Sequence, residues 1–162
     1  EEVLVEKVGE SKVETVHGDF RLMIFREKLS GQEHAAFVTP HLGKNPLVRV
    51  QSECPLGDLL PNAHCHCRED IAESFSLLAK STNGVFLSMR SGKEDLLSGM
   101  TRSLASGAED IHENMGHTEL RNYGIGAQIL RLLGISEMKL LTQSTRKIVG
   151  LDAYGLSVTE RI

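Results

Sequence analysis

Tryptophan is absent from this sequence of 162 residues, and aromatic residues of all kinds make up only 4% of it. Positive charge is not in excess, because 18 Lys and Arg residues are outnumbered by 22 Asp and Glu residues, for a formal net charge of −4. That balance excludes a strongly basic nucleic-acid-binding module. No apolar run approaches the roughly 18 residues of a membrane-spanning helix, so the sequence predicts neither a nucleic-acid nor a membrane partner.

Cysteine is also scarce, with three residues in the chain. An odd number of cysteines does not fit the paired framework of a secreted, disulfide-stabilised protein. The three thiols are inert, reactive or metal-binding, and composition leaves these alternatives open. No charged and apolar leader opens the sequence, so a reducing cytoplasmic location is expected. The start at Glu1 instead of Met indicates a domain excised from a longer chain.

The first half of the chain has the pattern of strands, and the second half alternates strands with helices. Residues 19–25 alternate in polarity, and residues 35–38 and 47–51 are short β-prone runs between glycine-bearing turns. Apolar residues at helical spacing predict helices over 69–80 and 122–133. The remaining predicted elements are strands over 85–89, 138–141 and 156–161, a short helix over 145–154, and a segment over 91–107 that is either a weak helix or mobile.

This order of elements is typical of an α+β (α/β-like) protein with a mixed sheet flanked by helices. We predict a single domain over residues 1–162, because the length suits one core, which at this size buries about two-thirds of the unfolded surface. The sequence contains no internal repeat, linker or low-complexity tract.

The cysteines have the spacing C-x10-C-x-C, at Cys54, Cys65 and Cys67. In an extended stretch residues two apart point the same way, so Cys65 and Cys67 are expected to converge while His64 and His66 point to the other side. Three thiolates around Zn²⁺ leave a fourth tetrahedral position to water, the arrangement of catalytic rather than structural zinc. Reduced, buried cysteines are the alternative, but three within fourteen residues, interleaved with histidines, favour a metal site.

Several segments resemble those of GTP cyclohydrolase II, in the same order and over almost the whole chain. That family reads R-V-x-S-E-C-x-x-G-D, then R-C-D-C, then D-x-R-x-Y-x-x-G-A-Q-I-L, then L-L-T-N-N-P-x-K and a closing strand. The corresponding segments here are R-V-Q-S-E-C-P-L-G-D at 49–58, C-H-C at 65–67, L-R-N-Y-G-I-G-A-Q-I-L at 120–130, L-L-T at 140–142 with Lys147, and V-T-E-R at 158–161.

The resemblance implies the fold and the activity of that family. GTP cyclohydrolase II opens riboflavin biosynthesis by hydrolysing the imidazole ring of GTP, which releases formate and pyrophosphate and leaves a diaminopyrimidine ribosyl phosphate. The resemblance implies Zn²⁺ held by Cys54, Cys65 and Cys67, with Mg²⁺ assisting at the phosphates. Family members tend to be homodimers, and many are fused behind a 3,4-dihydroxy-2-butanone 4-phosphate synthase, so both kinds of partner are implied.

The resemblance also implies roles for residues at matching motif positions. Arg121 falls on the arginine that takes the α-phosphate covalently, and Glu119 falls on the acid two residues before it, where it would act as a base. The other implied substrate contacts are Arg49 and Glu53 at the nucleotide, Asp70 at the guanine edge, and Thr142 and Lys147 at the phosphates.

The departures from the family pattern gather at chemical positions. Where the family has Q-E-G-R-G-I-G-L after a strand, this chain reads S-G-K-E-D-L at 91–96, so Glu94 and Asp95 replace a phosphate-binding cation. Lys93 does not reproduce the fork of an arginine. The remaining departures are Asp70 for a glutamine, which leaves an acceptor-only group, Glu119 for Asp, Q-S-T for N-N-P at 143–145, and His64 and His66 beside the cysteines in place of Arg and Asp.

Three hypotheses follow from this mixture of matches and departures. The favoured one is a degenerate GTP cyclohydrolase II-like domain that serves as a structural or regulatory module for a fused 3,4-dihydroxy-2-butanone 4-phosphate synthase. The second is an active, zinc-dependent GTP cyclohydrolase II with an altered loop. The third, suggested by Asp70, is a zinc hydrolase acting on another purine or pyrimidine nucleotide. Taken singly, the changes also fit a solvated acidic loop, surface histidines and a surface arginine at Arg121.

Overall fold

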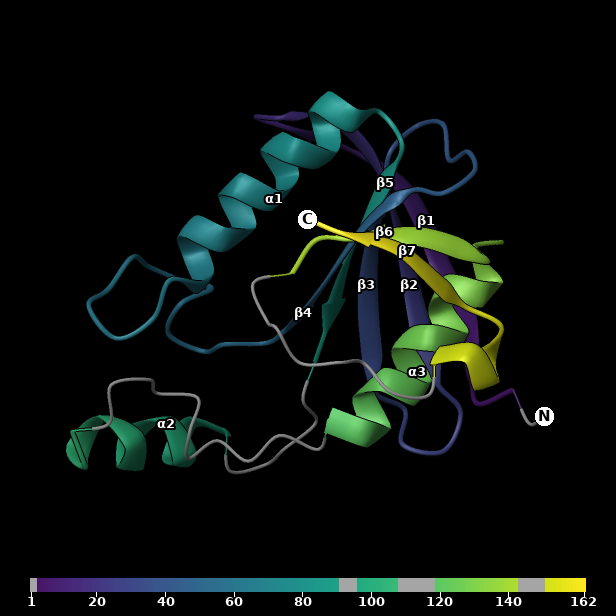
Figure 1. Ribbon diagram of the computed structural model, residues 1–162. Coiled ribbons are helices and arrows are strands. Elements are labelled where there is room, and N and C mark those ends of the chain that lie inside the picture. The colour runs from purple at the N-terminus through teal and green to yellow at the C-terminus, as the bar shows by residue number, and fades with distance from the viewer. Residues whose placement is uncertain (1–2, 91–95, 108–118, 143–150) are drawn as a thin grey trace.

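The computed structural model describes residues 3–90, 96–107, 119–142 and 151–162 (Figure 1). Within them the chain forms one seven-stranded sheet in the order β1-β2-β3-β5-β4-β6-β7. The strands are β1 Val5–Thr15, β2 Gly18–Glu27, β3 Glu33–Val38, β4 Leu47–Ser52, β5 Gly84–Met89, β6 Glu137–Leu140 and β7 Ser157–Arg161. The helices are α1 Cys67–Ser81, α2 Leu96–Ala105, α3 Glu119–Leu132 and the 3-10 helix η2 Leu151–Tyr154. The predicted α+β class with a mixed sheet and flanking helices is confirmed.

The sheet has an antiparallel half and a parallel half. Strands β1, β2, β3 and β5 pair antiparallel, whereas β4 pairs parallel with both β5 and β6, and β6 pairs parallel with β7. The sequence did not predict β1, because only Val5 of this edge strand is buried and most of its other side chains are exposed. Such a strand lacks the apolar alternation on which a prediction depends.

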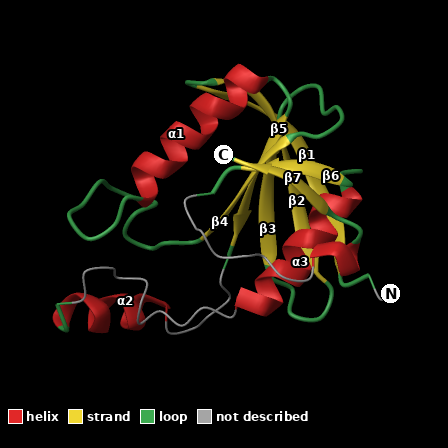
Figure 2. Cartoon of the chain, in the orientation of Figure 1, coloured by secondary structure: helices red, strands yellow, loops and turns green. Residues whose placement is uncertain are grey.

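The two long helices cover opposite faces of the sheet (Figure 2). On one face α1 packs its Phe75 ring against Phe86 at a centroid distance of 4.6 Å and against Phe20 at 5.3 Å. On the other face α3 contributes Ile125 and Ile129 to the larger core cluster. Burying both faces explains why the central strands are rich in apolar residues.

Most predicted elements are present with shifted ends. Of the segment over 91–107, residues 96–105 form α2, so the helical alternative describes them, and residues 91–95 lie outside the described residues. Of the short helix predicted over 145–154, residues 151–154 are helical and form a 3-10 helix, and 143–150 lie outside the described residues. None of the described helices is both long and apolar enough to cross a bilayer.

The parallel half of the sheet positions the candidate site. The connection from β4 to β5 runs through α1 on one face, and the connection from β5 to β6 includes α3 on the other (Figure 2). The neighbours β4 and β6 therefore flank a topological switch point, where open α/β sheets bind ligands beyond the carboxyl ends of their strands. Cys54 follows the end of β4, and Thr142 follows the end of β6.

Candidate metal centre

Three sulfur atoms converge beyond the end of β4. The Sγ atoms of Cys54, Cys65 and Cys67 all lie within 4.8 Å of one another, and those of Cys54 and Cys65 are 4.0 Å apart. Three thiolates at a Zn–S distance of 2.3 Å form a tetrahedral edge of about 3.8 Å, so the spacing fits one zinc ion. Cys54 and Cys65 are buried and Cys67 is half-buried.

The backbone that brings the sulfurs together differs from the predicted one. Residues 65–67 are not an extended stretch, because Cys67 is already the first residue of α1 and His66 is its N-cap with φ −115° and ψ 21°. The loop after Cys54 turns back onto the first residues of α1 and so brings the three sulfurs together. In an extended strand, the alternation of side chains would have brought Cys65 and Cys67 to the same side. The side chains of His64 and His66 are exposed and are not part of the sulfur cluster.

Gly57 keeps the space beside the sulfurs clear. A Cβ atom at this position would lie 2.5 Å from the Cβ of Cys67 and 2.6 Å from the Sγ of Cys65, which no real side chain tolerates. The backbone N–H of Gly57 also donates to the Sγ of Cys54 at 3.3 Å. The loop thus approaches the cysteines with bare backbone, as a compact thiolate centre requires.

Polar groups around the centre hold the loop in place. The Asp58 carboxylate accepts the backbone N–H of Cys54 at 3.0 Å, and the guanidinium of Arg68 donates to the carbonyls of Asp58 and Leu59, each at 3.4 Å. The N–H of Glu53 donates to the carbonyl of Met89 at 2.8 Å and so ties the loop to β5. Such outer groups orient ligands and tune a metal.

Without a metal Cys67 favours its protonated form. Hydrogen bonding with Cys54, followed by burial, raises the pKa of the Cys67 thiol well above its ordinary value. A bound cation reverses this preference, because a coordinating thiol loses its proton. Zn²⁺ fits the three sulfurs, and when bound in a three-thiolate site it activates a water molecule at the fourth position. Cys54, Cys65 and Cys67 would hold it.

Arg49 links two strand ends at the switch point. Its Nη1 donates to the carbonyl of Leu141 at 3.3 Å and its Nη2 to the Oε1 of Gln51 at 3.4 Å, whereas its buried Nε has no hydrogen-bond partner among the described residues. The backbone N–H of Thr142 donates to the carbonyl of Ile162 at 3.1 Å. The family resemblance implies a nucleotide contact for Arg49, and in the structure its side chain bridges β4 and the residue that follows β6.

The other predicted site residues are placed to different extents. Glu53 is half-buried next to Cys54, and Asp70 is half-buried in the first turn of α1. The backbone of Glu119 and Arg121 forms the first turn of α3, and their side chains are not described. Residues outside the description are Lys93, Glu94, Asp95, Gln143, Ser144, Thr145 and Lys147.

Sequence reasoning missed the residues that shape the loop. Gly57 lies within the quoted C-P-L-G-D run, and Asn62 follows Pro61; glycine, proline and asparagine are all residue types common in turns. Those signals indicate a turn, but contact with sulfur depends on how the loop folds back. Asn62 donates to the Sγ of Cys65 at 3.4 Å.

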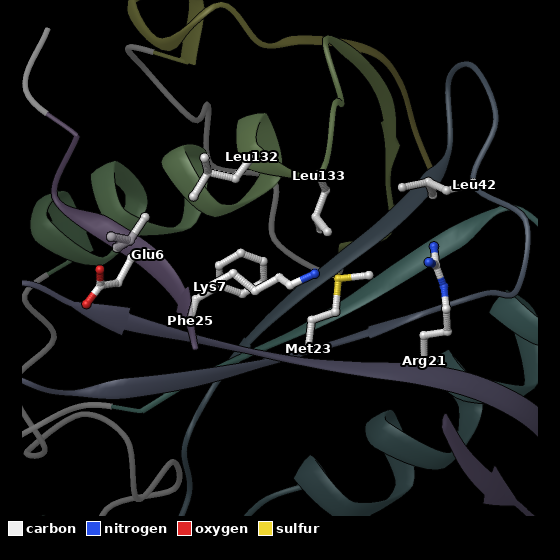
Figure 3. A pocket seen from close by; sticks show the side chains of 9 residues that line it. Glu6, Lys7, Arg21, Met23, Phe25, Leu42, Leu132 and Leu133 are labelled. Atoms are coloured by element: carbon white, nitrogen blue, oxygen red, sulfur yellow. The ribbon is translucent and has the colours of Figure 1, made fainter. Parts of the chain in front are cut away.

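A cavity of about 570 Å³ lies on the face covered by α3 and is a weaker candidate (Figure 3). Phe25, Met23 and Arg21 stand in a row along β2, and Lys7 of β1 reaches over them. The Lys7 ammonium pairs with Glu10 at 2.6 Å, and the core residues of this floor are already buried. No group of three metal-ligating side chains other than the cysteines occurs in the described part of the chain.

Comparison with known proteins identifies the family of this chain. The model of the family described as GTP cyclohydrolase II matches residues 6–162. The chain is 37% identical to the riboflavin biosynthesis protein RibBA of Phocaeicola vulgatus, over 100% of this chain and 42% of that protein. It is also 37% identical to the RibBA of Aquifex aeolicus, over 99% of this chain and 42% of that protein.

A solved structure has the same fold. The chain matches RibBX of A. baumannii, described as a two-domain 3,4-dihydroxy-2-butanone 4-phosphate synthase, with a TM-score of 0.55 and 26% identity. The match covers 99% of this chain and 40% of that one. The chain thus spans about 42% of the length of the curated relatives it matches. With the family model matching nearly all of its residues, the chain belongs to the GTP cyclohydrolase II family.

Proposed function

We propose that this chain is a GTP cyclohydrolase II-like domain that has kept its metal-holding end and lost part of its phosphate-binding end. It acts as a structural or regulatory module for a 3,4-dihydroxy-2-butanone 4-phosphate synthase. The observation that carries this proposal is the contrast between three converging cysteine sulfurs and the carboxylates of Glu94 and Asp95, which stand where the family pattern has a phosphate-binding arginine.

An acidic residue and an arginine interact with a phosphate with opposite sign. A carboxylate about 4 Å from a phosphate charge raises the energy by on the order of 1 to 4 kcal/mol at effective dielectric constants between those of water and a protein surface. The arginine that the family has there would lower it by a similar amount and add a bidentate geometry. Replacing the arginine by a carboxylate therefore weakens the binding of a triphosphate much more than it weakens the binding of a metal ion by the cysteines.

The similarity to RibBX supports the partner in this proposal. That protein is a two-domain 3,4-dihydroxy-2-butanone 4-phosphate synthase, and this chain corresponds to 40% of it. A domain of this family can therefore be part of a polypeptide described only by the synthase activity. We include in the proposal a cytoplasmic location, which is expected from the sequence, and a homodimeric assembly, which is implied by the family likeness.

Release of formate from GTP tests the proposal. Protein loaded with Zn²⁺ and supplied with Mg²⁺ and GTP is expected to release none. In the full-length protein that contains this chain, stripping the zinc is expected to change the rate of 3,4-dihydroxy-2-butanone 4-phosphate formation. GTP turnover that disappears in both Cys65→Ala and Arg121→Ala would contradict the degenerate assignment.

A charge reversal sharpens the same test. Glu94→Arg is expected to tighten GTP binding at least about tenfold, because the sign of one contact worth more than about 1.4 kcal/mol is inverted. Glu14→Arg makes the same charge change on an exposed position of β1, remote from the cysteines, and is expected to leave GTP binding unchanged. Calorimetric titration with GTP measures both.

An active GTP cyclohydrolase II is the second candidate. It is favoured by the converging sulfurs together with the retention of matching residues, namely Arg49, Glu53, Arg121, Thr142 and Lys147. This candidate requires micromolar GTP binding and Mg²⁺-dependent formate release. Formate or ammonia released from a different nucleotide would instead support the substrate change that Asp70 suggests.

A further inference from the structure

Asn62 uses every hydrogen-bonding group of its side chain in the loop between Cys54 and Cys65. Its Oδ1 accepts the backbone N–H of His64 at 2.8 Å and that of Cys65 at 3.0 Å. Its Nδ2 donates to the carbonyl of Leu60 at 3.2 Å and to the Sγ of Cys65 at 3.4 Å. One side chain therefore fixes both the backbone and the sulfur of the same cysteine.

The orientation of the Asn62 amide follows from its partners. Two backbone N–H groups point at one end of the amide, and an N–H donor needs an oxygen there. Turning the amide over would place its NH₂ group against both donors, so the nitrogen must face the sulfur. This donor can still be used when Cys65 coordinates a metal, because a metal-bound sulfur accepts hydrogen bonds.

We propose that Asn62 is a positioning residue of the metal centre, which orients Cys65 as a ligand through both ends of its amide. The oxygen sets the turn that places the Cys65 backbone, and the nitrogen holds the sulfur toward Cys54 and Cys67. Groups of this kind typically change metal affinity by about 10- to 100-fold when they are removed. The inference concerns metal binding alone, so it holds for a degenerate and for an active domain, and its failure is separate from any result with GTP.

The test compares zinc dissociation constants, measured by competition with a chromophoric chelator, for two variants of Asn62. Asn62→Ala removes both functions and is expected to raise the dissociation constant by about 10- to 100-fold. Asn62→Asp keeps an oxygen for the two backbone N–H groups but has no donor for the sulfur, and it is expected to lose at least as much. Because Asn62→Asp preserves the turn, it carries the test if Asn62→Ala does not fold.

Asn83 supplies a matched control. Its Oδ1 accepts the N–H of Gly43 at 2.7 Å and its Nδ2 donates to the carbonyl of Lys44 at 2.9 Å, so it also bridges backbone groups, but away from the cysteines. Asn83→Ala is expected to bind zinc within about twofold of the parent protein. An equal loss in Asn83→Ala would mean that the Asn62 effect is general loosening of the fold and would overturn the proposal.

Cobalt substitution gives a spectroscopic signal that does not depend on the stability of the fold. With Co²⁺ at saturation, the thiolate-to-metal absorption of the Asn62 variants is expected to shift or weaken relative to the parent protein and to Asn83→Ala, because the Cys65 sulfur is held differently. Zinc binding by Asn62→Asp equal to the parent would refute the donor role of Nδ2. Parent-like binding by Asn62→Ala, or a parent protein that binds neither metal, would refute the whole proposal.

Discussion

Two clusters of metal-ligating side chains lie in the interior among the residues that the structure describes, and they differ in whether the members of each cluster satisfy one another. Glu27 and His34 form a pair in which Nε2 lies 2.7 Å from Oε2, with side-chain exposures of 10% and 0%. The backbone N–H of Arg90 donates to the other ring nitrogen, Nδ1, at 2.9 Å. Since Nδ1 accepts, the ring proton is assigned to Nε2, where it faces the carboxylate.

The cysteine centre is arranged in the opposite way. Its three sulfurs point at one another, and neighbouring N–H groups and the bare backbone of Gly57 surround them. Ionised thiols brought together in this manner need a cation, whereas a histidine beside a carboxylate already has its partner. The comparison teaches that residue type alone does not identify a candidate ligand site. The distinguishing feature is that several atoms able to donate electron pairs to a metal converge without a partner of opposite charge among them.

The largest expected effect is the loss of a metal ligand. Cys65→Ala is expected to weaken zinc binding by more than about 100-fold, which exceeds the usual effect of an outer group, because one of three ligands is gone. Elemental analysis of the purified protein should find about one zinc per chain in the parent and little in the variant. Zinc content unchanged by Cys65→Ala would show that the cysteines do not hold the metal.

Removal of the metal should also reduce stability. At zinc concentrations about 1,000 times the dissociation constant, binding stabilises the folded state by about 4 kcal/mol, and a strong chelator abolishes that contribution. His34→Ala lowers stability by its own mechanism, so the difference in melting temperature with and without chelator should remain as in the parent. If the effect of the chelator on the melting temperature vanished in His34→Ala, the Glu27–His34 pair and the cysteine centre would be energetically coupled.

A smaller effect is expected from filling the space beside the sulfurs. Gly57→Ala places a Cβ atom 2.6 Å from the Sγ of Cys65, so the loop must move away and zinc affinity should fall by about tenfold or more. Gly43→Ala is the control, because its Cβ atom would meet Asn83 at an ordinary 3.6 Å. Titration of both variants with zinc measures the difference, and parent-like affinity in Gly57→Ala would mean that the loop adapts freely.

The long helices could be predicted from the sequence because their apolar spacing is local. The helices predicted over 69–80 and 122–133 correspond to α1 Cys67–Ser81 and α3 Glu119–Leu132. Their ends differ from the prediction because helix termini depend on neighbouring loops. Strand β1 could not be predicted, because it is an edge strand whose position is set by pairing with β2 rather than by its own apolar residues. The order of the strands likewise depends on contacts distant in sequence.

In the candidate site, too, features that depend on local spacing could be predicted and features that depend on distant contacts could not. Spacing indicated that Cys54, Cys65 and Cys67 form one group, although the backbone at Cys67 is helical and not extended. The contacts of Gly57 and Asn62 with the cysteine sulfurs could not be predicted, because they arise only after the loop folds back. The Glu27–His34 pair is equally invisible in sequence, because it depends on the register that sets Phe25 of β2 opposite His34 of β3.

The smallest effect on the metal, and a clear effect on stability, is expected from the pair itself. Glu27→Ala leaves a buried ring N–H of His34 without its acceptor, which typically costs about 1 to 3 kcal/mol. The control is Glu33→Ala, which breaks the ion pair with Arg26 at 2.9 Å, where both side chains are more than 40% exposed. Exposed pairs of that kind contribute about 0 to 1 kcal/mol, so Glu33→Ala should unfold at nearly the parental denaturant concentration.

Chemical denaturation in the presence of a chelator separates these outcomes, because stability is then compared without the metal. If the two buried groups are independent, Glu27→Ala lowers the unfolding midpoint and leaves the zinc dissociation constant within about twofold, since sites without shared partners contribute additively. Arg90, whose backbone is held by His34, is the residue after Met89, and Met89 accepts the Glu53 N–H next to Cys54. A parallel loss of zinc affinity in Glu27→Ala would therefore trace coupling through this backbone connection, and the self-contained pair would become a remote support of the metal centre.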